Sequence, residues 1–153
     1  MVKKVVLKAS VPISDVELRR AAAFRSALRR LLARTADVAG AAGLTSQRYD
    51  LLLAIKTGAG ETSTMTDLSI RLSLRQTAVT ELVKRAEEAD LIERSPSAAD
   101  GRVSVLALTA EGERRLMRAF VALRDERRHL AEAMSAVGSS FRAFAHSQRE
   151  VDR

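Results

Sequence analysis

The 153-residue sequence has no cysteine and no tryptophan, and aromatic residues make up only 3% of it. Without cysteine, disulfides, a thiolate nucleophile, thiolate metal ligands and cysteine-based redox sensing are excluded. The scarcity of aromatics leaves the core to Leu, Val and Ala, a composition that favours helices. A signal peptide and a run of about 18 apolar residues are also missing, so we expect a cytoplasmic protein with no membrane partner.

The sequence also lacks the residue groupings that metal sites and enzymes use. His129 and His146 are the only histidines, and with no cysteine nearby neither has the spacing of a zinc site. Carboxylate pairs such as Glu87 and Glu88 lie in charge-mixed helical surroundings, where nothing would tune them for acid–base catalysis. No Ser/His/Asp arrangement or phosphate-binding glycine loop is visible. We therefore expect no enzyme activity, no metal and no cofactor.

The chain is basic, but its charge is unevenly placed. Lysine and arginine total 26 against 19 acidic residues, and the formal net charge of +7 fits a polyanionic partner. The stretch 65–102, however, has six basic residues against seven acidic ones. The excess lies in the N-terminal arm and the long end helices. Their arginines either flank a DNA backbone or form a solvated face, and we favour the solvated face.

A long helix is predicted to begin after Ser14, because Ser14 and Glu17 form the S-x-x-E pattern of a capping box. Before it, residues 1–13 can form an edge strand, a tail that crosses a partner subunit, or a partly disordered arm, which we favour. Within the helix, apolar residues recur at steps of three and four. This stripe comprises Ala21, Phe24, Leu28, Leu31, Leu32 and Thr35.

A shorter, leucine-rich helix is predicted next. Gly40 and Gly43 end the first helix, because glycine is the usual residue after a helix C-terminus. Thr45 then caps the new helix, which ends before Gly58. Its three consecutive leucines indicate a buried element.

The stretch 65–108 organises the rest of the chain. Thr66 or Thr64 starts one helix, Ser73 marks a tight turn, and residues 75–89 form a second helix. Two alternating segments then indicate antiparallel strands joined by a loop rich in turn-forming residues. The strands cover residues 91–94 and 103–108. This order predicts a winged helix-turn-helix, a mainly α fold with a small β-wing, and double-stranded DNA is the first partner to consider.

The helix at 75–89 is the expected recognition helix. Val79, Leu82, Val83 and Ala86 share one face, so the opposite face points outward. A helix fits the major groove of B-DNA, where Gln can engage adenine and Lys can reach guanine or phosphate. The side chains on or beside the outward face are Gln76, Thr77, Thr80, Glu81, Lys84 and Arg85.

Glu81 is the one acidic residue among these side chains. It can accept a hydrogen bond from cytosine while its charge rejects phosphate. It can equally pair with Arg85 or Lys84 and take no part in reading bases.

Three arginines and one aspartate complete the expected DNA surface. Arg75 at the helix start and Arg94 after the first wing strand are placed for phosphates, which fix register without reading sequence. Arg102 at the wing can enter the narrow minor groove over A·T steps. Asp100 is expected to orient the Arg102 guanidinium rather than to touch DNA.

A final long helix is predicted to begin after Thr109 and to carry a seven-residue apolar repeat, with Arg127 at its one polar position. The repeat calls for a partner helix, either as a core stripe within the chain or in a second copy. We favour a dimer, because the chain has too little else to cover two long amphipathic helices. After a break at 138–140, a last short helix would bury Phe141 and Phe144. The repeat comprises Leu116, Phe120, Leu123, Leu130, Met134 and Val137.

These landmarks resemble the multiple antibiotic resistance regulator (MarR) family over residues 14–150. The most specific part is the wing, where D-x-R at 100–102 is followed six residues later by L-T-x-x-G. Leu44-Thr45 before the leucine-rich helix and Leu91-Ile92-Glu93-Arg94 after the recognition helix fit the same pattern. The chain departs from this pattern at three positions. It has Ser73 and Asp90 where the family commonly has Gly, and Ala86 where the family commonly has Leu.

The resemblance implies one domain over residues 1–153, with dimerisation helices at 14–43 and 110–150 around a DNA-binding module at 45–109. It also implies a homodimer whose recognition helices reach successive major grooves of a palindromic operator. Such a protein would be a ligand-responsive transcription regulator, which we take to be a repressor. The alternative is a winged-helix protein-interaction module without a specific operator.

In the family, a small-molecule effector binds between the dimer helices and the DNA-binding module. By this resemblance the lining here would include Phe24, Leu28, Tyr49, Leu53 and Phe120, although each can equally be core. Tyr49 is the best orienting contact, because its hydroxyl prefers a hydrogen-bond partner when buried.

Overall fold

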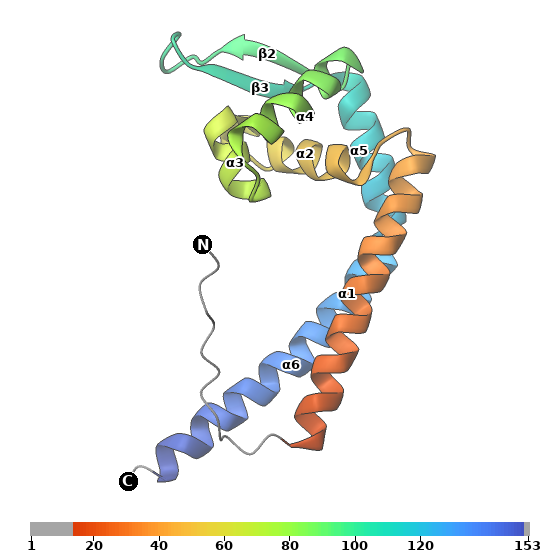
Figure 1. Cartoon of the computed structure of the whole chain (residues 1–153), viewed down its shortest axis with the longest axis vertical. Coiled ribbons are helices and arrows are strands. Elements are labelled where there is room, and N and C mark those ends of the chain that lie inside the picture. The colour runs from red at the N-terminus through yellow and green to blue at the C-terminus, as the bar shows by residue number, and fades with distance from the viewer. Residues whose placement is uncertain (1–13, 152–153) are drawn as a thin grey trace.

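The fold is a winged-helix module at one end of a two-helix stalk (Figure 1). The computed structural model describes residues 14–151, with side chains for residues 14–139. The two stalk helices, α1 and α6, pack side by side as they run away from the module. The elements are α1 (Asp15–Ala41), α2 (Ser46–Lys56), the 3-10 turn η1 (Ala59–Glu61), β1 (Thr62–Ser63), α3 (Met65–Leu72), α4 (Gln76–Glu88), β2 (Ile92–Pro96), β3 (Ser104–Leu108), α5 (Ala110–Ala122) and α6 (Arg124–Val151).

The module has the predicted winged-helix topology. Its three-stranded antiparallel sheet has the order β1-β3-β2, with Ser63 of β1 opposite Leu106 of β3. The wing hairpin pairs Ile92 with Leu108 at its base and Pro96 with Ser104 near its tip. The predicted mainly α fold with a small β-wing is therefore confirmed. The largest fully buried side chains of the module are Leu51, Leu52, Ile55, Leu68, Leu91 and Leu106.

Helix boundaries follow the capping residues that the sequence predicts. The hydroxyls of Ser14, Thr45 and Thr109 each accept a hydrogen bond from the backbone N–H three residues later, at 3.0 to 3.2 Å. At the end of α1, Gly43 has φ +73°, a left-handed conformation in which glycine carries no steric penalty. Gly40 lies inside α1, so Gly43 alone supplies the predicted stop.

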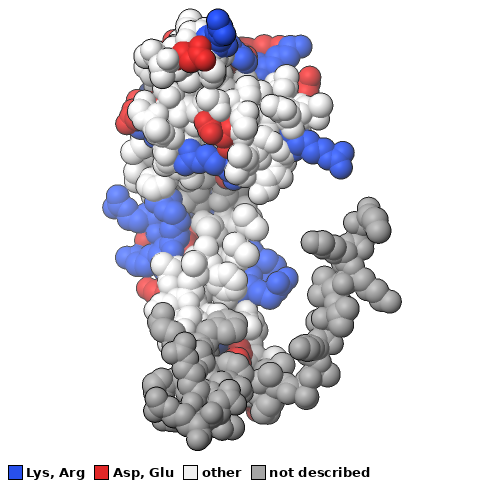
Figure 2. Space-filling view, turned by 90° about the vertical axis from the view of Figure 1, so that its left-hand side faces the viewer, with Lys and Arg blue, Asp and Glu red and all other residues white. Residues whose placement is uncertain are grey.

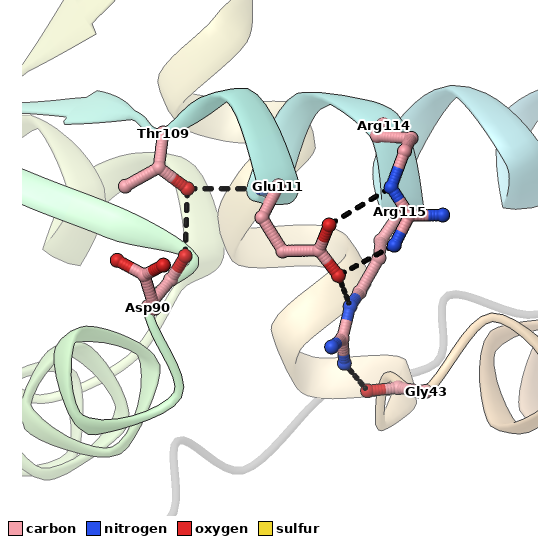
Figure 3. Close-up of polar contacts among 7 residues, drawn as sticks. Gly43, Asp90, Thr109, Glu111, Arg114 and Arg115 are labelled. Atoms are coloured by element: carbon pink, nitrogen blue, oxygen red, sulfur yellow. Dashed lines mark hydrogen bonds and ion pairs between the residues drawn. The ribbon is translucent and has the colours of Figure 1, made fainter.

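The start of α5 is held against the end of α4 (Figure 3). Thr109 Oγ1 donates to the Asp90 carbonyl at 2.7 Å and accepts from the Gly112 N–H at 3.0 Å. A Cβ at Gly112 would lie only 1.9 Å from the Leu91 carbonyl oxygen. Glycine is therefore required for α5 to come this close, which gives a physical reason for the T-x-x-G spacing.

The same turn of α5 also contacts the end of α1 (Figure 3). Arg115 Nη1 donates to the Gly43 carbonyl at 3.0 Å, and Arg115 Nε donates to Glu111 at 2.6 Å. Arg114 donates to the same carboxylate, and the hydrogen bonds from Arg114 and Arg115 lower the pKa of Glu111. The first turns of α5 thus connect the recognition helix to the stalk.

The C-terminal helix is broken at a different place from the one predicted. The chain turns at Leu123, between α5 and α6, whereas α6 continues through residues 138–140. Leu123 is buried in the core, and the turn lets α5 cover the module while α6 follows α1. Arg127 Nη1 donates to the Phe120 carbonyl at 2.6 Å, and its guanidinium lies 3.6 Å from the Phe120 ring centroid. Gly and Ser at 138–140 weaken a helix but need not end it.

The predicted apolar stripe of α1 is only partly buried in the described chain. Thr35 is buried, but Ala21 and Leu32 are exposed, with 61% of Leu32 accessible. Val38 and Ala39 belong to the buried face instead. The remaining stripe residues, all half-buried, are Phe24, Leu28 and Leu31.

Two predictions fall on parts of the chain that the structure does not describe. They are the burial of the side chains of Phe141 and Phe144 and the alternatives for residues 1–13.

Replacing Gly112 tests the contact between α5 and the module. We expect Gly112→Ala to lower the free energy of unfolding by about 1–3 kcal/mol, because the methyl group must displace the Leu91 backbone. Gly40→Ala is the matched control, since a Cβ there meets nothing within 4 Å. It should raise stability by about 0.5–1 kcal/mol through helix propensity. Denaturant unfolding measures both, and an equal change in the two variants would contradict the close contact.

Candidate nucleic-acid interface

The first helix of the helix-turn-helix, α3, begins with a complete capping box at Thr64. The Thr64 N–H donates to Asp67 Oδ2 at 3.1 Å, and the Asp67 N–H donates to Thr64 Oγ1 at 3.2 Å. Thr64, rather than Thr66, is therefore the helix start. The Thr64 side chain also donates to the carboxylate at 2.8 Å, and these hydrogen bonds lower the pKa of Asp67.

Arg71 holds α3 against the end of α2, a role that the sequence did not reveal. Its Nη2 donates to the Thr57 carbonyl at 3.2 Å and to Thr57 Oγ1 at 2.8 Å, and its Nη1 donates to the Ala54 carbonyl. A cation suits these carbonyls, because the C-terminal end of a helix carries partial negative charge. Arg71 therefore positions α3 and is not a free cation for DNA.

Two left-handed residues bound the recognition helix α4 where the family commonly has glycine. Ser73 has φ +54° in the turn before α4, and Asp90 has φ +55° after it. Asp tolerates this conformation better than most residues, and the Asp90 carbonyl is held by Thr109. The turn and the helix end therefore keep their geometry despite both departures.

The recognition helix has the two faces that the sequence predicts. Val79, Leu82, Val83 and Ala86 are buried. Arg75 is the N-cap residue and provides no side-chain cap, so the first N–H groups of α4 have no capping side chain and suit an anion. All the predicted side chains of this helix are exposed, namely Arg75, Gln76, Thr77, Thr80, Glu81, Lys84 and Arg85.

Intrahelical contacts distinguish two of these exposed residues. Thr80 Oγ1 donates to the Gln76 carbonyl at 2.9 Å, so the hydroxyl proton of Thr80 is already used. Glu81, in contrast, forms no ion pair or hydrogen bond with any described side chain, and neither Lys84 nor Arg85 neutralises it. The pairing alternative for Glu81 is therefore not realised in the structure.

Two arginines brace the C-terminal half of α4. Arg48 of α2 donates to the Arg85 carbonyl at 3.2 Å, a contact that the sequence did not suggest. Arg94, expected as a phosphate contact, pairs with Glu87, and its Nε lies 3.1 Å from Glu87 Oε1. The Arg94 side chain is 42% exposed and lies midway along β2, so it still borders the outward surface.

The wing places Arg102 in solvent and corrects the expected role of Asp100. Asp100 Oδ1 accepts a hydrogen bond from the backbone N–H of Arg102 at 3.0 Å, not from its guanidinium. A short aspartate side chain reaches the N–H two residues on, which is the geometry of an Asx turn. Among the described side chains the Arg102 guanidinium has no partner. Asp100 therefore shapes the loop and leaves the arginine free.

The five residues expected to line an effector pocket come from α1, α2 and α5. Tyr49 is buried, and burial raises the pKa of its hydroxyl, while the neighbouring positive charge of Arg127 opposes this shift. Leu53 lines a cavity of about 350 Å³ together with Asp50 and Arg71. Burial also raises the pKa of Asp50. The other three residues, all half-buried, are Phe24, Leu28 and Phe120.

Basic side chains gather on the stalk as well as on the module (Figure 2). The arginines of α1 lie along the stalk, which leads away from the wing (Figure 1). One of them, Arg34, approaches Glu126 of α6 to 3.7 Å, with more than half of its side chain exposed. This placement favours the solvated-face interpretation of the stalk arginines.

Within residues 14–139, no cluster of three or more His, Asp or Glu side chains is arranged to hold a metal ion. None of the helices in the described chain is both long and apolar enough to cross a membrane.

Residues 42–103 match the sequence model of the MarR family. Solved structures share the fold, among them AbsC, a MarR family transcriptional regulator from Streptomyces coelicolor. It is 20% identical, the alignment covers 92% of this chain and 99% of that one, and the TM-score is 0.65. A mutant MarR from E. coli complexed with operator DNA is 16% identical, with 88% and 99% coverage and a TM-score of 0.63. BldR from Sulfolobus solfataricus is 18% identical, with 90% and 99% coverage and a TM-score of 0.60.

No curated protein sequence matches the chain. The matched segment 42–103 runs from the end of α1 to the wing, and the structural likeness extends through both stalk helices. Together they confirm the resemblance drawn from the sequence: the chain has the MarR-family winged-helix fold, and its central segment carries that family's sequence pattern.

Proposed function

We propose that this protein is a sequence-specific transcription regulator that binds a palindromic operator as a homodimer and acts as a ligand-responsive repressor. One observation carries the proposal: α4 buries its apolar face and exposes each of its own side chains predicted to contact DNA, beside a wing on which Arg102 is free. A helix presented in this way matches the width of the major groove. The shared fold with a MarR solved on operator DNA supports it further.

The exposed residues divide into positioning and reading roles. Arg75 and the uncapped first turn of α4 would bind phosphate, and Arg94 on β2 would add a second phosphate contact. Arg102 would enter the minor groove. The side chains proposed to face base edges or their flanks are Gln76, Thr77, Thr80, Glu81, Lys84 and Arg85.

The stalk supports a homodimer. Within the described residues the stalk consists of α1 and α6 alone, so each helix covers just one face of the other (Figure 1). Large apolar side chains remain exposed on both helices, with Leu18 at 56%, Leu32 at 61% and Met134 at 55%. A second copy would cover them and continue the heptad-like packing of α6.

A charge at Leu32 tests the dimer. We expect the wild-type chain to sediment as a dimer at micromolar concentration and Leu32→Glu to shift it towards monomer, because the carboxylate would be buried between copies. Ile70→Glu is the control: Ile70 is 73% exposed but lies on α3, away from the stalk. A wild-type monomer, or an equal effect of the two substitutions, would contradict this dimer.

The effector proposal rests on the junction of α1, α2 and α5. Tyr49 is the one buried tyrosine there, and the half-buried Arg127 provides a positive charge beside its hydroxyl. By the resemblance, a small molecule at these two groups would also contact Phe24, Leu28 and Phe120, whereas Leu53 lines the cavity that α2 forms with α3. The dimer would have two conformations that differ in the spacing of its DNA-binding modules. The small molecule would change operator affinity by binding one of these conformations more tightly than the other.

Arg102 gives the sharpest test of the DNA contact. On fragments selected from genomic DNA, we expect Arg102→Ala to weaken binding by about 1–3 kcal/mol and to reduce the salt slope by about one. Arg30→Ala is the matched control, since it removes the same charge from the stalk. Gel-shift titrations over a range of salt concentrations measure both variants.

Two results would count against these assignments. Unchanged affinity and slope in Arg102→Ala would remove Arg102 from the interface. Selection that yields only weak, sequence-independent binding would favour the alternative, a winged-helix protein-interaction module.

A further inference from the structure

The recognition helix carries an unpaired carboxylate at the centre of its outward face. Glu81 is the sixth residue of α4 and is exposed, with no ion pair or hydrogen bond among the described side chains. Lys84 and Arg85 follow at three and four residues, the spacings at which helical ion pairs usually form. Glu81 is therefore available to a partner outside the chain.

A carboxylate is a costly group to bring to DNA. The carboxylate of Glu81 lies on the surface proposed to face a duplex that carries a negative charge about every 1.7 Å along its axis. Repulsion from a phosphate about 4 Å away costs roughly fivefold in affinity even in water. Lys84 and Arg85 form no ion pair with Glu81 that would offset this cost, so the carboxylate must find a donor on the bases or weaken binding.

The major groove offers such a donor. An ionised carboxylate only accepts hydrogen bonds, which matches the N4 amino group of cytosine. The acceptors of guanine, and the O4 and methyl group of thymine, offer it no hydrogen bond. Adenine has an amino group, but its N7 acceptor lies beside it and would repel a carboxylate.

We infer that Glu81 determines operator specificity: it requires a cytosine at one position of each half-site and disfavours DNA that lacks it. The inference rests on the proposed function. Specificity is the difference between the affinities for two sites. Glu81 gains a hydrogen bond on a site with the cytosine, whereas on other DNA only the phosphate repulsion remains. This suits a module whose charge is close to neutral, since such a module gains little from non-specific attraction.

Glu88 provides a matched control on the same helix. It is seven residues after Glu81, so it points in nearly the same direction from a place about 10 Å further along the axis. It too is exposed and lacks a partner among the described side chains. Glu88→Gln removes the same charge as Glu81→Gln, at the end of the helix where HTH proteins make fewer base contacts.

The experiment selects binding sites from a randomised duplex library with the wild type, Glu81→Gln and Glu88→Gln. Affinities are then measured on the selected operator, on its variants at each half-site position and on unrelated DNA. We expect the wild type to prefer cytosine at one position by about 5- to 150-fold. Glu81→Gln should relax that preference, because its amide keeps an acceptor for cytosine but adds donors that other bases accept, and it should bind unrelated DNA about fivefold more tightly. Glu88→Gln should keep the preference.

Failure of the Glu81 inference and failure of the proposed function give different results. If Glu81→Gln and Glu88→Gln change affinity alike and leave every base preference intact, Glu81 contributes charge only and the inference fails. If the wild type selects no motif, the proposed function itself fails, which is a distinct result. Thermal unfolding of the three proteins confirms that the substitutions leave the fold intact, as expected for exposed glutamates on one helix face.

Discussion

The close approach of α5 to the Leu91 backbone at Gly112 is the contact on which the geometry of the rest depends. It brings Thr109 to the Asp90 carbonyl, which fixes the end of the recognition helix, and it brings Arg115 to Gly43, where the stalk begins. Because the same turns of α5 contact both the end of α4 and the end of α1, we expect a rotation of the stalk to carry α4 with it. Any effector that changes the relation of α1 to α5 would therefore change the spacing of the two recognition helices in a dimer, which is how a ligand at this junction could control DNA binding.

The proposed DNA surface has few cationic side chains that are free of partners within the fold. Although the chain has a net charge of +7, residues 65–102 are close to neutral, and two of their arginines already have partners within the fold. Arg71 holds α3, and Arg94 pairs with Glu87. What remains is the uncapped helix start with Arg75, the exposed Lys84 and Arg85 of α4, a free wing arginine and the unpaired Glu81. Such a surface would bind DNA weakly without the right bases. We therefore expect a large ratio between its affinity for the operator and its affinity for unrelated DNA.

Sequence reasoning was most successful where structure is decided locally. The caps Ser14, Thr45 and Thr109 and the two faces of α4 depend on neighbours within a few positions, and these were predicted. The errors concern contacts between residues distant in sequence, or a side chain that binds a nearby backbone group instead of its expected partner. The break at Leu123 depends on packing against a module formed by preceding residues, and the acceptors of Arg71 lie at the end of α2. Asp100 was expected to reach a guanidinium, but a backbone N–H two residues away is nearer.

The central claim is that two copies of this module read one two-fold symmetric site. Hydroxyl-radical footprinting on a fragment selected from genomic DNA tests it most directly. The account predicts two protected half-sites related by a dyad, with centres about one helical turn apart, at a stoichiometry of one dimer per site. Protection of a single asymmetric half-site by one chain, or uniform protection along the fragment, would contradict it.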